Sequence, residues 1–149
     1  MDIINEKKSD NSVIASNIYC LHYLLPNNKL LEDVDFLSYF KNLKHKYYIL
    51  SSNHICIHIL DSLHYNTLAG KVNFNLYGKY VAITQQPEHS IELFKNLIKD
   101  FDINKINKIK VYSKKIENEN KFIIQDGCHR LSILLFYNYS NIDKYISIL

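Results

Sequence analysis

Tryptophan is absent from the 149 residues, and methionine (1), proline (2), glycine (3) and cysteine (3) are scarce. An odd number of cysteines does not suggest a small disulfide framework. No apolar run reaches the roughly 18 residues that a membrane span needs, and the polar segment 1–10 lacks the apolar stretch of a signal peptide. We therefore expect one cytoplasmic domain, 1–149, long enough to bury a core without disulfides.

Arginine is the rarest of the charged residues. Of the 18 lysine and arginine residues, only Arg130 is arginine. Lysine supplies charge anywhere, but only arginine offers a planar fork of donors that grips a phosphate or carboxylate through two hydrogen bonds. The net charge of +3 allows a phosphate or nucleic-acid ligand, although it is too small to predict a DNA-coating surface. DNA is therefore not the expected partner.

The spacing of apolar residues predicts a mixture of helices and strands, and hence an α+β fold. We expect a short apolar segment over 17–25 and a hairpin over 71–84 that turns at Tyr77-Gly78. A polar loop is expected over 114–120. The remaining expected elements are helices over about 30–45, 87–101 and 128–137, and strands over 47–50, 55–60, 109–112, 121–125 and 144–149.

The segment from Gln125 to Arg130 carries the strongest functional signal. It joins an apolar strand, 122–124, to an apolar helix. Gly127 allows close backbone approach to a ligand, and the amides of the next helix offer unpaired donors and a positive dipole end. His129 and Arg130 fall in the first helical turn, so we expect both to point to one anion. Asp126 could cap the helix, hold a metal or accept a proton, although Asp-Gly is also an ordinary turn dipeptide.

The run Asp126-Gly127-Cys128-His129-Arg130 resembles the ParB/sulfiredoxin superfamily, over about residues 80–149. The resemblance implies a compact α+β core of that type, with about residues 1–70 as an N-terminal α/β extension. The free serine kinases of the superfamily carry Asp-Gly-x-His-Arg and an upstream glutamate, for which Glu88 is the nearest candidate. This match implies phosphoryl transfer from ATP or ADP, with Mg²⁺, to a small hydroxyl compound.

The same resemblance implies a role for each residue of the site. Asp126 would be metal ligand or base, and His129 and Glu88 would be catalytic. The residues that would bind the nucleotide phosphates are Gly127, Cys128, His129 and Arg130 of the turn, together with Gln86. Chromosome-partitioning ParB proteins carry Gly-Glu-Arg-Arg, so only Gly127 and Arg130 match that branch, which makes partitioning improbable.

Two alternatives stay open. Sulfiredoxins carry Gly-Cys-His-Arg, which residues 127–130 match in full, although they have glycine where this chain has Asp126. That match implies an ATP-dependent reductase with Cys128 as nucleophile, and a thiol at a helix N-terminus near cations is reactive. The other alternative is a nucleotide-sensing or partner-binding module without turnover.

Two further clusters carry possible chemistry. His54, Cys56 and His58 alternate on one face of an expected strand, and His-x-Cys-x-His offers metal ligands to which His64, Cys20 and His22 could add. A partly buried strand face or a wall of the nucleotide pocket explains the same pattern, because zinc sites more often use Cys-x₂-Cys spacings. Gln86 and Glu88 start a helix, where ligand contact and simple capping are equally good explanations.

Overall fold

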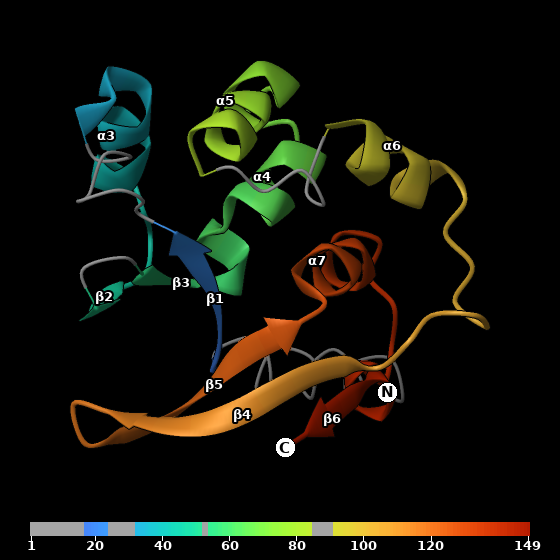
Figure 1. Ribbon diagram of the computed structural model, residues 1–149. Coiled ribbons are helices and arrows are strands. Elements are labelled where there is room, and N and C mark those ends of the chain that lie inside the picture. Colours follow the sequence, from blue (N-terminus) through green and yellow to red (C-terminus); the bar gives the residue numbers. More distant parts are fainter. Residues whose placement is uncertain (1–16, 24–31, 52–53, 85–90) are drawn as a thin grey trace, which may run out of the picture.

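The centre of the molecule is a curled six-stranded sheet with strand order β2-β3-β1-β5-β4-β6 (Figure 1). The structure, a computed structural model, describes residues 17–23, 32–51, 54–84 and 91–149. The α+β class is confirmed. The strands are β1 (Ile18–Tyr23), β2 (Tyr48–Ser51), β3 (His54–His58), β4 (Ile109–Ile116), β5 (Glu119–Asp126) and β6 (Ile146–Ile148).

The two halves of the chain meet in the middle of this sheet. β1 pairs in parallel with β5, with Ile18 opposite Phe122 and Tyr19 opposite Ile123. On its other edge β1 pairs antiparallel with β3. The N-terminal half therefore contributes three adjacent strands to the same sheet as the C-terminal half, and the start of β1 lies beside the strand that leads to the Asp126-Gly127 turn.

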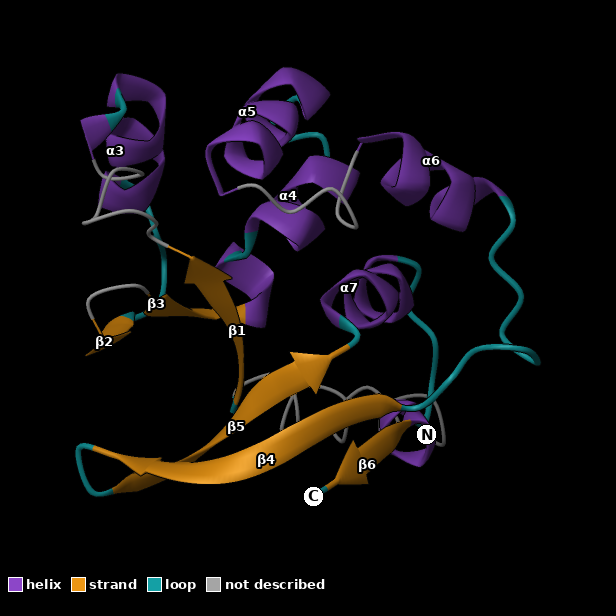
Figure 2. Ribbon diagram, viewed as in Figure 1, coloured by secondary structure: helices purple, strands orange, loops and turns teal. Residues whose placement is uncertain are grey.

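Helices gather on one side of the sheet (Figure 2). The first described one has an Asp33 cap, whose carboxylate accepts from the amides of Asp35 and Phe36. α7 lies between the β4–β5 part of the sheet and the other helices. The helices are α3 (Val34–Lys41), α4 (Leu63–Leu68), α5 (Phe74–Thr84), α6 (Ile91–Lys99) and α7 (Cys128–Phe136), with short 3₁₀ helices η1 (Ile59–Asp61) and η3 (Ile142–Tyr145).

Two buried clusters hold the helices in place. The first joins α3, α5 and α6 to β3 and includes Phe36, Tyr77 and Phe94. The second lies between α7 and the sheet and includes Ile109 and Leu131. Because α7 is anchored on the second cluster, the turn at its start is held rigidly against β4.

The expected hairpin over 71–84 is wrong. Residues Phe74–Thr84 form the helix α5, and Tyr77 and Tyr80 are both almost completely buried. Their spacing of three residues puts them on one helical face, and burying two large aromatic side chains outweighs the turn preference of Gly78. The expected helix over 30–45 is confirmed in a shorter form as α3, and that over 87–101 as α6 from Ile91 on; residues 87–90 lie outside the described part.

The expected polar loop over 114–120 is also wrong. β4 continues to Ile116 and β5 starts at Glu119, so Glu117 and Asn118 alone form the turn. Both have positive φ, 52° and 68°, as a two-residue type I′ hairpin requires. The strand expected over 55–60 ends at His58, and that expected over 144–149 is reduced to β6. In the described part of the chain, no helix has the length and apolar character to cross a membrane.

Candidate functional site

The turn between β5 and α7 has the backbone shape that the sequence predicts. Gly127 is the N-cap of α7, with φ 114° and ψ 22°, and no side chain caps the helix. The amide of Leu131 donates to the Gly127 carbonyl at 2.9 Å, so the intrahelical hydrogen bonds of α7 start at Leu131. A Cβ atom on Gly127 would lie 3.0 Å from Cγ1 of Ile109 and 3.0 Å from Nη2 of Arg130. Glycine is therefore required both by the backbone angle and by the close packing.

Arg130 folds back over this turn. Its Nη1 donates to the Asn107 carbonyl at 2.7 Å and approaches the Lys108 carbonyl at 3.4 Å. Its Nη2 lies 3.1 Å from Oδ2 of Asp126, in a pair whose side chains are 14% and 65% exposed. The loop before β4 and the end of β5 thus hold the guanidinium beside the first turn of α7, while the Asp126 carboxylate stays largely in solvent.

His129 points elsewhere. Its Nε2 is 2.5 Å from the hydroxyl of Tyr77 on α5. Its ring contacts His64 on α4 and Phe94 on α6, at centroid distances of 4.4 and 4.6 Å. The expectation that His129 and Arg130 point to one anion is therefore wrong: the helical periodicity sends consecutive residues in different directions, and His129 faces the neighbouring helices.

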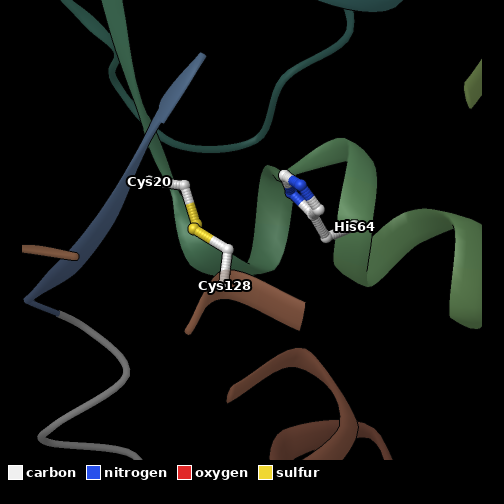
Figure 3. Close-up of side chains that lie close together, drawn as sticks. All are labelled: Cys20, His64 and Cys128. Carbon is white, nitrogen blue, oxygen red and sulfur yellow. The ribbon is translucent and has the colours of Figure 1, made fainter. Parts of the chain in front are cut away.

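Cys128 faces the sheet and meets a second cysteine. Its Sγ lies 2.8 Å from Sγ of Cys20 on β1, and both are free cysteines. His64 stands beside them from α4 (Figure 3). Burial, and then the contact with Cys128, raise the pKa of the Cys20 thiol well above its ordinary value, so Cys20 is a neutral thiol at neutral pH. A cysteine that packs onto this buried thiol is poorly placed to attack a large substrate.

The strand face of His54, Cys56 and His58 does not form a metal site. Among the described residues, the side chains that come together as possible ligands of one ion are instead Cys20, His64 and Cys128. Cys56 is fully buried, and burial raises the pKa of its thiol to about 12. Nδ1 of His58 accepts from the amide of Leu60 at 3.1 Å. Cys56 is thus used for packing and His58 for capping η1.

A second polar centre was missed by the sequence analysis. Nδ1 of His45 lies 3.0 Å from Oδ2 of Asp61, and the His45 ring stacks on His58 at 3.9 Å. Both His45 and Asp61 line a cavity of about 540 Å³ beside α3 and α5. A buried carboxylate that orients a histidine is a common arrangement for proton transfer. His45 lies in a loop and Asp61 in η1, 16 residues apart, and this spacing matches no sequence pattern that would have predicted the pair.

The helix start that carries two of the expected site residues falls outside the part of the chain that the structure describes. Gln86 and Glu88 both lie outside the described residues, so their expected roles stay predictions. The cavity beside α3 and a smaller one of about 300 Å³ beside β4 and β6 are not lined by residues 125–130.

Comparison with known proteins adds no relative. A scan against protein-family models gives no match, and searches of curated proteins and of solved structures give none either. The resemblance to the ParB/sulfiredoxin superfamily therefore stays a prediction, and function has to be argued from the geometry of the chain.

Proposed function

We propose that this protein is a nucleotide-dependent phosphotransferase that binds the phosphates of ATP or ADP at the β5–α7 turn. The observation that carries the proposal is the position of the Arg130 guanidinium. It lies against Gly127, beside the amides at the start of α7. Fixed positive charge and the amides of a helix start, brought together at one place, are the elements of a phosphate site.

The contacts of Arg130 explain why arginine stands here and not one of the lysines. The Asn107 carbonyl and the Asp126 carboxylate hold opposite sides of the guanidinium, and a lysine ammonium has no second arm for such a grip. A donor that is held before the ligand arrives loses little entropy on binding.

Asp126 is the residue best placed to serve the transfer. Its exposed carboxylate can hold Mg²⁺ against the phosphates or accept the proton of the attacking hydroxyl group. Mg²⁺ commonly takes one or two carboxylates together with phosphate oxygens. The terminal phosphoryl group would then pass to the acceptor oxygen as its bond to the nucleotide breaks, which releases ADP from ATP or AMP from ADP, while Arg130 and the helix amides stabilise the charge on the phosphate oxygens. His129 is bound to Tyr77 and would position α7.

The proposal includes the fold type. The order α6, β4, β5, α7 follows the helix, strand, strand and helix expected from the sequence over 87–137, and such an order supports a core of the superfamily type. Within that superfamily, the contact between Cys128 and the buried Cys20 favours the kinase branch over the sulfiredoxin branch, because a sulfiredoxin nucleophile must be open to another protein.

Nucleotide-induced stabilisation is the direct test. The melting temperature of the wild type is measured with ATP, ADP and CTP in Mg²⁺, beside Arg130→Lys and the control Lys46→Ala. Lys46 is exposed and pairs with Glu117, on the far arm of the sheet. A ligand at 100 times its Kd stabilises the folded state by about 2.7 kcal/mol. We expect the shift in the wild type and in Lys46→Ala, and its loss in Arg130→Lys.

The outcomes separate the three functions. No shift of the melting temperature with any nucleotide would refute both the kinase and the ATP-dependent reductase. A shift without transfer of phosphate to a broad panel of hydroxyl compounds would favour the nucleotide-sensing module. Phosphate transfer that survives Cys128→Ala but is lost in Asp126→Asn would support the kinase and exclude Cys128 as nucleophile.

A further inference from the structure

Three potential metal ligands from three separate elements meet behind the turn. Cys20 comes from β1, His64 from α4, and Cys128 is the first residue of α7. The potential ligand atoms all lie within 4.8 Å of one another. Cys20 and His64 are 0% and 1% exposed, so this is an interior cluster and not a chance grouping of surface side chains (Figure 3).

The fold itself brings these residues together. The parallel pairing of β1 with β5 puts Cys20 alongside the end of β5, where Cys128 follows. α4 packs against α7, which brings the His64 ring to the same point. The separations along the chain are 44 and 64 residues, so local structure alone would not gather them.

We propose that Cys20, His64 and Cys128 bind a Zn²⁺ ion. Zinc is a borderline-soft cation that takes thiolate and imidazole ligands at about 2.3 and 2.0–2.1 Å, in tetrahedral geometry. Such distances put ligand atoms roughly 3.5–3.8 Å apart. The two sulfur atoms therefore have to separate by about 1 Å from their 2.8 Å contact, a movement within reach of small rotations about the Cα–Cβ bonds.

Charge balance fits a buried ion. Two thiolates and a neutral imidazole neutralise the +2 charge, so the loaded site carries no net charge in the interior, where an unpaired ion is costly. The ion also makes up for the loss of the two thiol protons, because metal binding deprotonates cysteine ligands. Three protein ligands are the number found in zinc sites that keep a fourth position for water or substrate.

The surroundings hold the histidine ligand in place. The His64 ring meets the edge or face of His22 and Tyr77, at centroid distances of 5.5 and 5.7 Å, as well as His129. Packing of this kind orients a ligand ring before the metal arrives, and supporting partners of metal ligands contribute about 10–100-fold to affinity.

A disulfide between Cys20 and Cys128 is the main competing interpretation. It would need a sulfur–sulfur distance of about 2.05 Å, a change from the 2.8 Å contact no larger than the one that zinc requires. The distance therefore does not separate the two interpretations, but a disulfide would not use His64. Zinc uses all three side chains, which is why the observations favour it.

Metal content tests the proposal without any assumption about nucleotides. The untagged full-length protein is purified under reducing conditions without chelator, and bound zinc is measured by elemental analysis. The zinc-free protein is then titrated with Co²⁺, whose thiolate charge-transfer absorption reports sulfur ligands. The variants are Cys128→Ser, Cys20→Ser and His64→Gln. Cys56→Ser is the matched control, since Cys56 is an equally buried cysteine outside the cluster.

We expect one zinc per chain in the wild type and in Cys56→Ser, and zinc affinity at least about 100-fold weaker in each ligand variant. The wild-type measurement stands even if a buried variant fails to fold. Absence of zinc and of the cobalt spectrum in the reduced wild type would overturn the proposal. So would equal affinity in Cys128→Ser and Cys56→Ser, or a native mass without zinc that is lower than that of the reduced chain by two hydrogen atoms, as a Cys20–Cys128 disulfide gives.

Discussion

Replacing Gly127 by alanine probes the turn more sharply than any other single change. At φ 114° a residue with a Cβ atom is strained by about 1–2 kcal/mol. The added methyl group also meets Ile109, at 3.0 Å from Cγ1 and 3.1 Å from Cγ2. Arg130 can swing away, but Ile109 is completely buried, and such overpacking typically costs about 1–3 kcal/mol. We therefore expect a loss of about 2–5 kcal/mol in the free energy of unfolding.

Gly70 provides the matched control. It also has positive φ, 76°, but a Cβ atom there would meet nothing within 4 Å. Gly70→Ala should therefore show the backbone strain of about 1–2 kcal/mol without the packing cost. The entropy that alanine removes from the unfolded chain is common to both variants and cancels in the comparison.

Urea denaturation of the wild type and both variants measures the difference. We expect Gly127→Ala to be less stable than Gly70→Ala by about 1–3 kcal/mol, and its melting temperature to be lower by roughly 2–4 °C for each kcal/mol. If Gly127→Ala is as stable as Gly70→Ala, then the turn is not packed closely on β4. The argument that Gly127 and Arg130 form a rigid phosphate site would then fail.

Two further substitutions and one labelling experiment test other contacts of the structure. Tyr77→Phe removes the hydroxyl partner of His129 at almost constant volume, and should cost about 1–2 kcal/mol in urea denaturation; an unchanged midpoint would contradict the contact. Asp126→Asn removes a largely exposed partner of Arg130 and should change stability by at most about 1 kcal/mol, so a larger loss would mean that the ion pair is structural. Cys56, whose thiol pKa burial raises from 9.0 to about 12, should have about a thousandfold less thiolate at neutral pH. Iodoacetamide should therefore label it only after denaturation, as followed by mass spectrometry, and fast labelling of the native protein would refute its burial.

The local pattern of the sequence determined the elements around the turn. An apolar strand, a glycine and an apolar helix follow one another within 15 residues, and the observed β5, Gly127 and α7 agree with that prediction. The single arginine also stands at this turn, where Asn107 and Asp126 hold its guanidinium. These features depend on neighbouring residues and on the preference for glycine wherever φ is positive. They could therefore be predicted from the sequence alone.

Elements whose buried face depends on distant partners could not be predicted in this way. The local sequence around Tyr77 and Gly78 predicts a hairpin. The segment forms the helix α5 instead, because a helix buries both Tyr77 and Tyr80. The direction of His129 was equally undetermined, since only the presence of α5 and α6 beside α7 turns its ring toward Tyr77 and Phe94.

The tertiary structure alone decided which cysteines and histidines meet. The sequence offered the His54, Cys56 and His58 strand face as one possible ligand set, because its alternation is visible locally. The cluster that forms instead joins Cys20, His64 and Cys128, because β1 pairs with β5 and α4 packs on α7. Neither contact can be predicted from residue spacing, because strand pairing and helix packing depend on residues far apart in the sequence and on the packing of the whole core.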